Sequence, residues 1–188
     1  MIYEVFQAIA EELNEHLKYR FNETQDIVVL SNLIDLSGAK ALQTDNQVHM
    51  MLVRMEEDKT INRSGGYHGS MAEGNARLFN AFVLFAANFS GKQYPQGLNY
   101  ISRILEYFVA HPTLLPSDFP DFPQTIDSLV VELNSLEERE NSNLWGSIGS
   151  KLMPYLYYKI NFIPIHKESG FAKSAPTLSG LNPNAGGL

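Results

Sequence analysis

Cysteine is absent from this 188-residue chain. Disulfide frameworks, cysteine-based metal sites and cysteine nucleophiles are therefore excluded. Basic residues are also scarce, since 14 Lys and Arg stand against 21 Asp and Glu and give a net charge of −7. A nucleic-acid binder needs a basic face that displaces counterions from the phosphates. The charge balance thus argues against nucleic acid as a partner.

Long apolar segments are absent as well. No run approaches the roughly 20 residues that a membrane-spanning helix needs. Segment 1–21 is acidic and amphipathic, without the basic start and continuous apolar centre of a signal peptide. We therefore expect a cytoplasmic protein with no membrane partner.

Recognisable catalytic and metal-binding motifs are missing too. The 5 histidines form neither H-x-x-x-H nor H-E-x-x-H, the spacings typical of metal sites. The stretch RSGGYHGS lacks the Gly-Lys-Ser/Thr of a phosphate-binding loop. A triad could be drawn through Ser64, His68 and Glu73, but a triad needs a rigid scaffold and this glycine-rich segment supplies none. We expect no catalytic residue, no metal and no cofactor, and hence a protein that is not an enzyme.

What the sequence does contain is periodicity. Segment 2–17 repeats apolar residues at spacings of three and four, which predicts an amphipathic helix. Further elements follow from the same kind of pattern: helices at 95–112 and 135–153, and strands at 26–34, 47–57, 76–89, 125–136 and 155–165. The order is helix, three strands, helix, strand, helix, strand. It indicates the α+β class, with helices packed on a mixed or antiparallel β-sheet.

Burial can be predicted within several of these elements. Strand 76–89 carries apolar side chains on both faces, so we expect it to be central and covered on both sides, by helices or by a neighbouring subunit. Two buried stripes follow from residue spacing: Leu98, Ile101, Leu105 and Phe108 in the second helix, and Leu129, Val131 and Leu133 in the fourth strand.

The third helix contains the only tryptophan of the chain. Ser135 and Glu138 have the spacing of a capping box at its start. Pro154 is expected to end it, because proline cannot continue a helix. The expected buried stripe consists of Leu144, Trp145, Ile148 and Leu152.

Two glycines interrupt this predicted helix. Gly146 and Gly149 each cost about 1 kcal/mol relative to alanine in a helix interior. Small residues there would allow another backbone to approach closely, either from the same subunit or from a neighbour, and the sequence leaves both alternatives open. With Trp145 and Pro154, these glycines are the expected structural anchors of the region.

Two polar segments stand apart from the predicted core. Residues 59–75 form a long Gly-rich loop between two strands, and loops of that length are commonly functional or disordered. From residue 167 the composition shifts to Gly, Ser, Pro, Ala and Asn, which cannot form a core alone. We therefore expect an α+β domain at 1–166 and a flexible C-terminal tail at 167–188 that partner contacts would order.

Several stretches resemble, in order, those of one known family. They are MIYEVFQAIAEELNEHL at the start, then IVVLSNL, FVLFAANFS and VVELNSL, and finally LWGSIGSKLMPYLYYKI. This ordered set, over residues 1–165, resembles the tail terminator (cap) family of contractile injection systems, which are phage tail-like particles. No single stretch is diagnostic, and the order carries the resemblance.

The resemblance implies a structural protein with a phage tail-terminator-like fold. The family forms a hexameric ring at the distal end of the inner tube and sheath, where it stops polymerisation and anchors the last sheath layer. The implied partners are other copies of this chain, the inner tube protein and the sheath protein. The alternatives are a tube-completion or baseplate adaptor ring protein and, more remotely, a small-molecule enzyme, since fold does not fix function.

Flexibility and composition suggest which residues would make these contacts. Around the long loop we expect interface roles for Arg63, Tyr67 and Arg77, which would meet the tube or a neighbouring subunit. In the tail the corresponding residues are Phe171, Leu178 and Leu181, which would meet the sheath or an adjacent cap subunit. Side chains of these types gain most from burial in a partner's pocket.

Overall fold

The computed structural model describes residues 2–35, 37–41, 46–58, 78–120, 122–123 and 125–164. Within these ranges, six strands form one sheet of order β1-β2-β3-β6-β5-β4. The strands are β1 (Val28–Leu30), β2 (Gln47–Glu57), β3 (Phe79–Asn88), β4 (Thr113–Leu114), β5 (Ile126–Leu133) and β6 (Tyr155–Pro164). β1 runs parallel to β2, and the other neighbours are antiparallel. The predicted α+β class with a mixed sheet is therefore confirmed.

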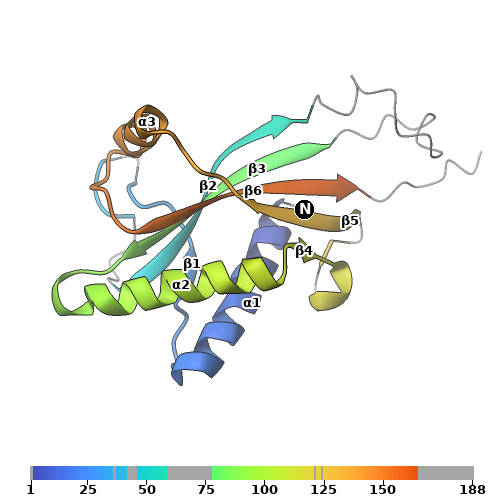
Figure 1. Cartoon of the computed structure of the whole chain (residues 1–188), viewed down its shortest axis with the longest axis horizontal. Helices are drawn as coiled ribbons and strands as arrows, with labels where there is room; N and C mark the ends of the chain where they lie inside the picture. Colours follow the sequence, from blue (N-terminus) through green and yellow to red (C-terminus); the bar gives the residue numbers. More distant parts are fainter. Residues whose placement is uncertain are drawn as a thin grey trace, which may run out of the picture.

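Helices cover both faces of this curled sheet (Figure 1). α1 (Ile2–Phe21) and α2 (Tyr94–Ala110) lie on one face, and α3 (Glu138–Ile148) lies on the other. Two short 3-10 helices, η1 (Gly91–Gln93) and η2 (Pro116–Asp118), precede α2 and follow β4. The element order matches the predicted one, apart from the two-residue strand β4 that the sequence pattern did not indicate.

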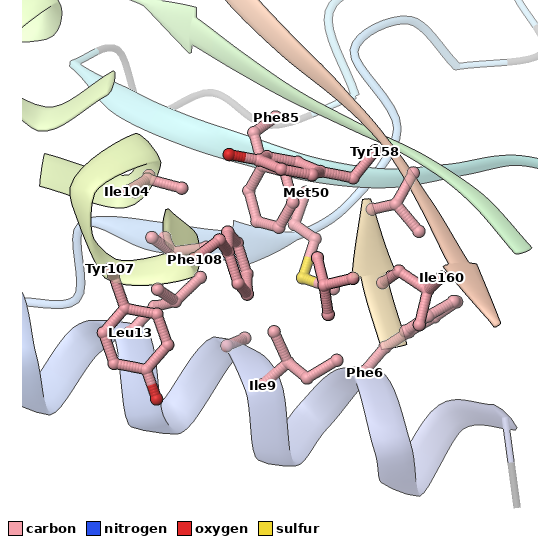
Figure 2. Packing of buried hydrophobic residues seen from close by; sticks show 14 of the residues in the cluster. Phe6, Ile9, Leu13, Met50, Phe85, Ile104, Tyr107, Phe108, Tyr158 and Ile160 are labelled. Carbon is pink, nitrogen blue, oxygen red and sulfur yellow. The ribbon is translucent and has the colours of Figure 1, made fainter. Parts of the chain in front are cut away.

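The larger core lies between the sheet and the pair α1 and α2. Figure 2 shows that side chains from α1, α2 and the sheet meet there. This core includes buried residues of α1 (Phe6, Ile9, Leu13), of α2 (Ile104, Tyr107, Phe108) and of the sheet (Met50, Phe85, Tyr158, Ile160). The ring of Phe108 lies 5.7 Å from that of Phe85 and 4.8 Å from that of Tyr158, centroid to centroid. This cluster fixes α2 on the centre of the sheet.

The central strand β3 is apolar on both faces, as the sequence predicts. Val83 and Phe85 point into the core under α1 and α2. Phe82 and Leu84 point to the opposite face, where they form a second cluster with Trp145 of α3. Helices of the same chain therefore supply the cover on both sides.

The predicted buried stripe of α2 is partly wrong. Phe108 is buried, but Leu98 is 41% exposed, and the helix buries Tyr100, Ile104 and Tyr107 instead. A tyrosine can be buried when its hydroxyl finds a partner. The Tyr100 hydroxyl donates to Glu23 Oε1 at 3.0 Å. Because hydrophobic periodicity alone gives tyrosine less weight than leucine, the predicted stripe was rotated away from the true one.

The boundaries predicted for the third helix also need correction. α3 begins at Glu138, and the backbone N–H of Glu137 donates to Glu140 Oε2 at 3.2 Å. The capping pair is therefore Glu137 with Glu140 and not Ser135 with Glu138. The Glu140 carboxylate supplies this acceptor beside the first turn, where the helix dipole also favours negative charge.

Gly149 ends α3, and the predicted stop at Pro154 is wrong. Gly149 has φ +74°, the left-handed conformation of a helix C-cap, and its N–H donates to Trp145 O at 3.1 Å. This conformation is costly for residues with a side chain and free for glycine. Leu152 therefore lies beyond the helix and is 67% exposed, outside the predicted buried stripe.

The extent of β1 and the burial of β5 also differ from the prediction. β1 covers only residues 28–30 of the predicted 26–34, and Ile34 pairs with Lys40 in an isolated bridge outside the sheet. In β5, Leu129 is buried as predicted, but Leu133 at the end of the strand is 52% exposed. Burial thus fades toward the end of β5.

Candidate assembly interface

One end of the sheet is where both polar segments of the chain attach. Glu57 at the end of β2 pairs with Phe79 at the start of β3, and Phe79 pairs with Phe162 near the end of β6. The Asp58 N–H donates to Leu78 O at 2.8 Å. The described residues that border segments 59–77 and 165–188 are Asp58, Leu78 and Pro164, and they therefore lie at the ends of adjacent strands, at the same end of the sheet (Figure 1). We refer to this end as the exit end.

The interface residues predicted from the sequence fall in these two segments. Arg63, Tyr67, Arg77, Phe171, Leu178 and Leu181 all lie outside the described residues. The structure therefore shows the strand ends that these residues follow or precede in the chain. Although the two groups are far apart in sequence, they start from neighbouring strands, which the sequence pattern did not reveal.

The opposite end of the sheet carries an apolar patch. Here the start of α2 lies beside the connection from α3 to β6. An open hollow of about 530 Å³ lies on this surface. It is lined by Phe89, Tyr94, Leu98, Asn141, Leu152, Met153, Pro154 and Tyr155. Tyr94 is 45% exposed, Leu98 41% and Leu152 67%. We call this surface the Leu152 patch.

The sequence pattern does not reveal the Leu152 patch, since its periodicity predicts that Leu98 and Leu152 are buried. Periodicity identifies apolar residues but cannot tell which of them the fold leaves outside the core. Contiguous exposed apolar surface on a soluble domain is typical of an interaction site. The only signal in the sequence was the cluster of apolar residues around Pro154 just past a glycine C-cap.

Beneath this patch, Trp145 attaches α3 to the sheet. Its ring is 6% exposed and packs edge to face on Tyr155, with centroids 5.4 Å apart. The Tyr155 hydroxyl donates to Asn141 Oδ1 at 2.8 Å, which joins α3 to β6 a second time. Gly146 lies on the outer side of the helix, where an added Cβ would meet no heavy atom within 4 Å. The part of the chain that the structure describes therefore makes no close approach to Gly146.

A groove of about 710 Å³ runs between α3 and the strands β2, β3 and β6. The Arg54 guanidinium lies over the ring of Phe82, 4.1 Å from its centroid, and 3.7 Å from the Glu56 carboxylate. A register shift at Leu52 and Arg54 turns two consecutive residues, Val53 and Arg54, toward this groove. Mixed charge over aromatic side chains is a composition suited to a protein partner.

Several titratable groups of the packed interior have shifted pKa values. Burial raises the pKa of Tyr100 and that of Tyr158 to about 12. Burial also lowers the pKa of His49, whose Nδ1 lies 2.8 Å from Ser31 Oγ. Among the residues that the structure describes, no group of three or more His, Asp or Glu is placed to hold a metal ion. Over the same residues, no helix has the length and apolar character needed to cross a membrane.

The solved structures that share this fold include two terminators of contractile particles. One is the sheath/tube terminator, in its extended state, of the extracellular contractile injection system PVC, with a TM-score of 0.59 at 17% identity over 100% of this chain and 65% of that chain. The other is the tube terminating cap of the anti-feeding prophage, with a TM-score of 0.57 at 14% identity over 95% of this chain and 60% of that chain. The fold is thus the α+β domain found in terminators of contractile injection systems, and the chain spans less than two thirds of either terminator.

The sequence profile of the Pvc16 N-terminal domain family matches residues 4–179. The chain belongs to this family, which confirms the resemblance to the tail terminators. The matched region continues past the described residues and includes Phe171 and Leu178. The sequence matches none of the curated proteins.

Proposed function

We propose that this chain is a structural cap of a contractile injection system, which ends the growth of the inner tube and sheath at the distal end of the particle. The observation that carries this proposal is the combined match of family and fold. Nearly the whole chain matches the Pvc16 N-terminal domain family, and both solved relatives are terminators or caps by name. The role is binding and not turnover.

A cap that closes a cylindrical tube is expected to be a ring, and we propose a hexamer. A ring needs a heterologous interface, in which two different surfaces of each subunit meet and the rotation closes. The molecule offers two such surfaces at opposite ends of its sheet: the exit end of β2, β3 and β6, and the Leu152 patch. These two ends provide the asymmetry that a head-to-tail ring requires.

The partners we propose are the inner tube protein, the sheath protein and further copies of this chain. Arg63, Tyr67 and Arg77 would contact the tube or a neighbouring subunit. Because segments 59–77 and 165–188 start from adjacent strands, one end of the subunit could engage two partners at once. That arrangement would couple the end of the tube to the last layer of the sheath.

The position of the chain on the particle tests the proposal. An epitope tag at the N-terminus, labelled with gold-conjugated antibody, can be located on purified particles by electron microscopy. The cap role predicts label at the distal end, opposite the spike. Label at the spike end would identify a baseplate adaptor instead. Particles without label would show that this chain is not a component of the assembled particle.

A further inference from the structure

We propose that the Leu152 patch is the docking site for the C-terminal segment of the neighbouring copy, with Phe171 as its anchor. The inference rests on the proposed ring and specifies the contact that closes it. It starts from the position of the patch, beside the first residues of β6, and from the exit of segment 165–188 at the other end of the same strand.

Chain length decides whether Phe171 can fill the patch of its own subunit. β6 has 10 residues and spans about 30 Å. Phe171 follows Pro164 by seven positions, and seven residues reach at most about 25 Å when fully extended. Phe171 therefore cannot return along the strand to its own Leu152 patch. A Phe171 side chain that fills a Leu152 patch must therefore come from another copy.

The chemistry of the two surfaces agrees with this pairing. Seven of the eight residues that line the patch have apolar or aromatic side chains, the eighth is Asn141, and none carries a charge. Leu152 is 67% exposed. The C-terminal segment carries isolated apolar residues in a sequence of Gly, Ser, Pro and Asn. A large aromatic side chain inserted into an apolar hollow is the usual anchor of a protein interface. The family match extends through residue 179, so Phe171 lies within the region shared by the family.

The occupant also has to join unlike surfaces. If the patch bound a second patch, the contact would be isologous and would close a dimer. A segment that leaves one end of the sheet and binds at the opposite end of the next copy repeats the same step around the ring. The contact thus supplies the heterologous interface that the ring requires.

The absence of cysteine makes a site-specific test possible. Purified full-length Leu152→Cys and Phe171→Cys proteins are mixed at increasing concentrations and treated with a short bismaleimide. We expect crosslinked dimers in the mixture and few when either protein is treated alone. Leu98→Cys, on the same patch, is expected to replace Leu152→Cys. Val109→Cys is the matched control, because Val109 lies on α2 outside the patch and is 74% exposed.

A variant that carries both Leu152→Cys and Phe171→Cys distinguishes contact between copies from contact within one chain. Docking on a neighbour predicts a ladder of linked subunits. A single internally linked chain, or a mixed-dimer yield no higher than that of the Val109→Cys control at the highest concentration, would overturn the proposal.

Failure of this inference and failure of the cap function give different results. Crosslinking reports contact between copies, whereas label position and particle length report capping. Label at the distal end without the Leu152–Phe171 crosslink would support the cap function and contradict this interface. The crosslink together with label at the spike end would support the interface and contradict the cap function.

Discussion

At the scale of single residues, Asn14 holds the first helix against the edge of the sheet. Its Oδ1 accepts hydrogen bonds from the N–H groups of Ile27 and Val28, both at 2.8 Å, and its Nδ2 donates to Val28 O at 2.8 Å. Asn14 is only 6% exposed. The side chain therefore provides hydrogen-bond partners for three backbone groups where β1 begins. Without Asn14, these buried groups would need partners from a neighbouring strand.

We predict that Asn14→Ala lowers the free energy of unfolding by about 2–5 kcal/mol, because it leaves buried backbone groups without partners. Urea unfolding monitored by circular dichroism measures the change. Gln7→Ala is the control on the same helix, since it removes only an exposed hydrogen bond to Glu11 and should change stability by less than about 0.5 kcal/mol. Equal effects of the two substitutions would contradict the assigned role of Asn14.

His49 makes stability depend on pH. Burial lowers its pKa in the folded protein below the ordinary value, which is about 6.5 in an unfolded chain. Below that pH the unfolded chain binds the proton more readily, so stability is full above pH 6.5 and falls as the pH decreases. The slope from one such group cannot exceed about 1.4 kcal/mol per pH unit.

We predict that His49→Gln flattens the loss of stability between pH 7.5 and pH 5.5. Urea midpoints measured at both pH values, for the wild type and the variant, give the comparison. The remaining histidines are common to both proteins, so their contributions cancel in the difference. An unchanged pH dependence would mean that His49 does not experience the buried environment described.

At the scale of elements, the two glycines of the α3 region have different roles. Gly149 requires φ +74°, whereas Gly146 has ordinary helical geometry and open space around it. We predict that Gly149→Ala destabilises the protein by about 1 kcal/mol through strain, and that Gly146→Ala stabilises it by up to about 1 kcal/mol. Thermal unfolding of the two variants should therefore shift in opposite directions. Shifts of the same sign would refute this division of roles.

The strongly patterned elements could be predicted from the sequence, and residues whose burial depends on tertiary partners could not. β2 was predicted with its correct bounds of 47–57, because eleven residues of strand pattern lie between turn signals. The predicted stripe of α2 is rotated from the observed one, which includes Tyr100. The hydroxyl of this buried tyrosine finds its partner in Glu23, a residue far away in sequence. Trp145 is buried as predicted, but Leu152, seven residues later in the same predicted stripe, is 67% exposed.

The candidate interface was less accessible to sequence reasoning than the fold. Composition identified segments 59–75 and 167–188, but their attachment to adjacent strand ends follows from the pairing of Phe79 with Phe162. The Leu152 patch needs three segments that meet only in the folded chain: the start of α2, the start of α3 and the connection to β6. Long-range pairing of this kind leaves no local periodic signal.

At the scale of the whole molecule, the sheet with its three helices is a platform from which the C-terminal segment departs. We predict that truncation after Lys167 leaves the unfolding free energy within about 0.5 kcal/mol of the wild type, because all described core residues precede position 165. The same truncation should abolish capping. Thermal unfolding and rescue of a deletion strain measure the two effects.

A truncation after Leu181 is the matched control for this experiment. It keeps Phe171, Leu178 and Leu181 and removes only seven residues, so we expect it to cap normally. If truncation after Lys167 also capped normally, the tail would have no part in the mechanism. If both truncations failed to cap while remaining folded, the final residues would be the essential ones.

The central claim is that this protein ends polymerisation of the tube and sheath. The most direct test is to delete its gene from the producing cell and measure particle lengths by negative-stain electron microscopy, with the wild-type gene returned as the control. The account predicts overlong or ragged tubes and sheaths of widely varying length, restored to uniform length by the returned gene. Particles of normal length with ordinary distal ends in the deletion strain would contradict it.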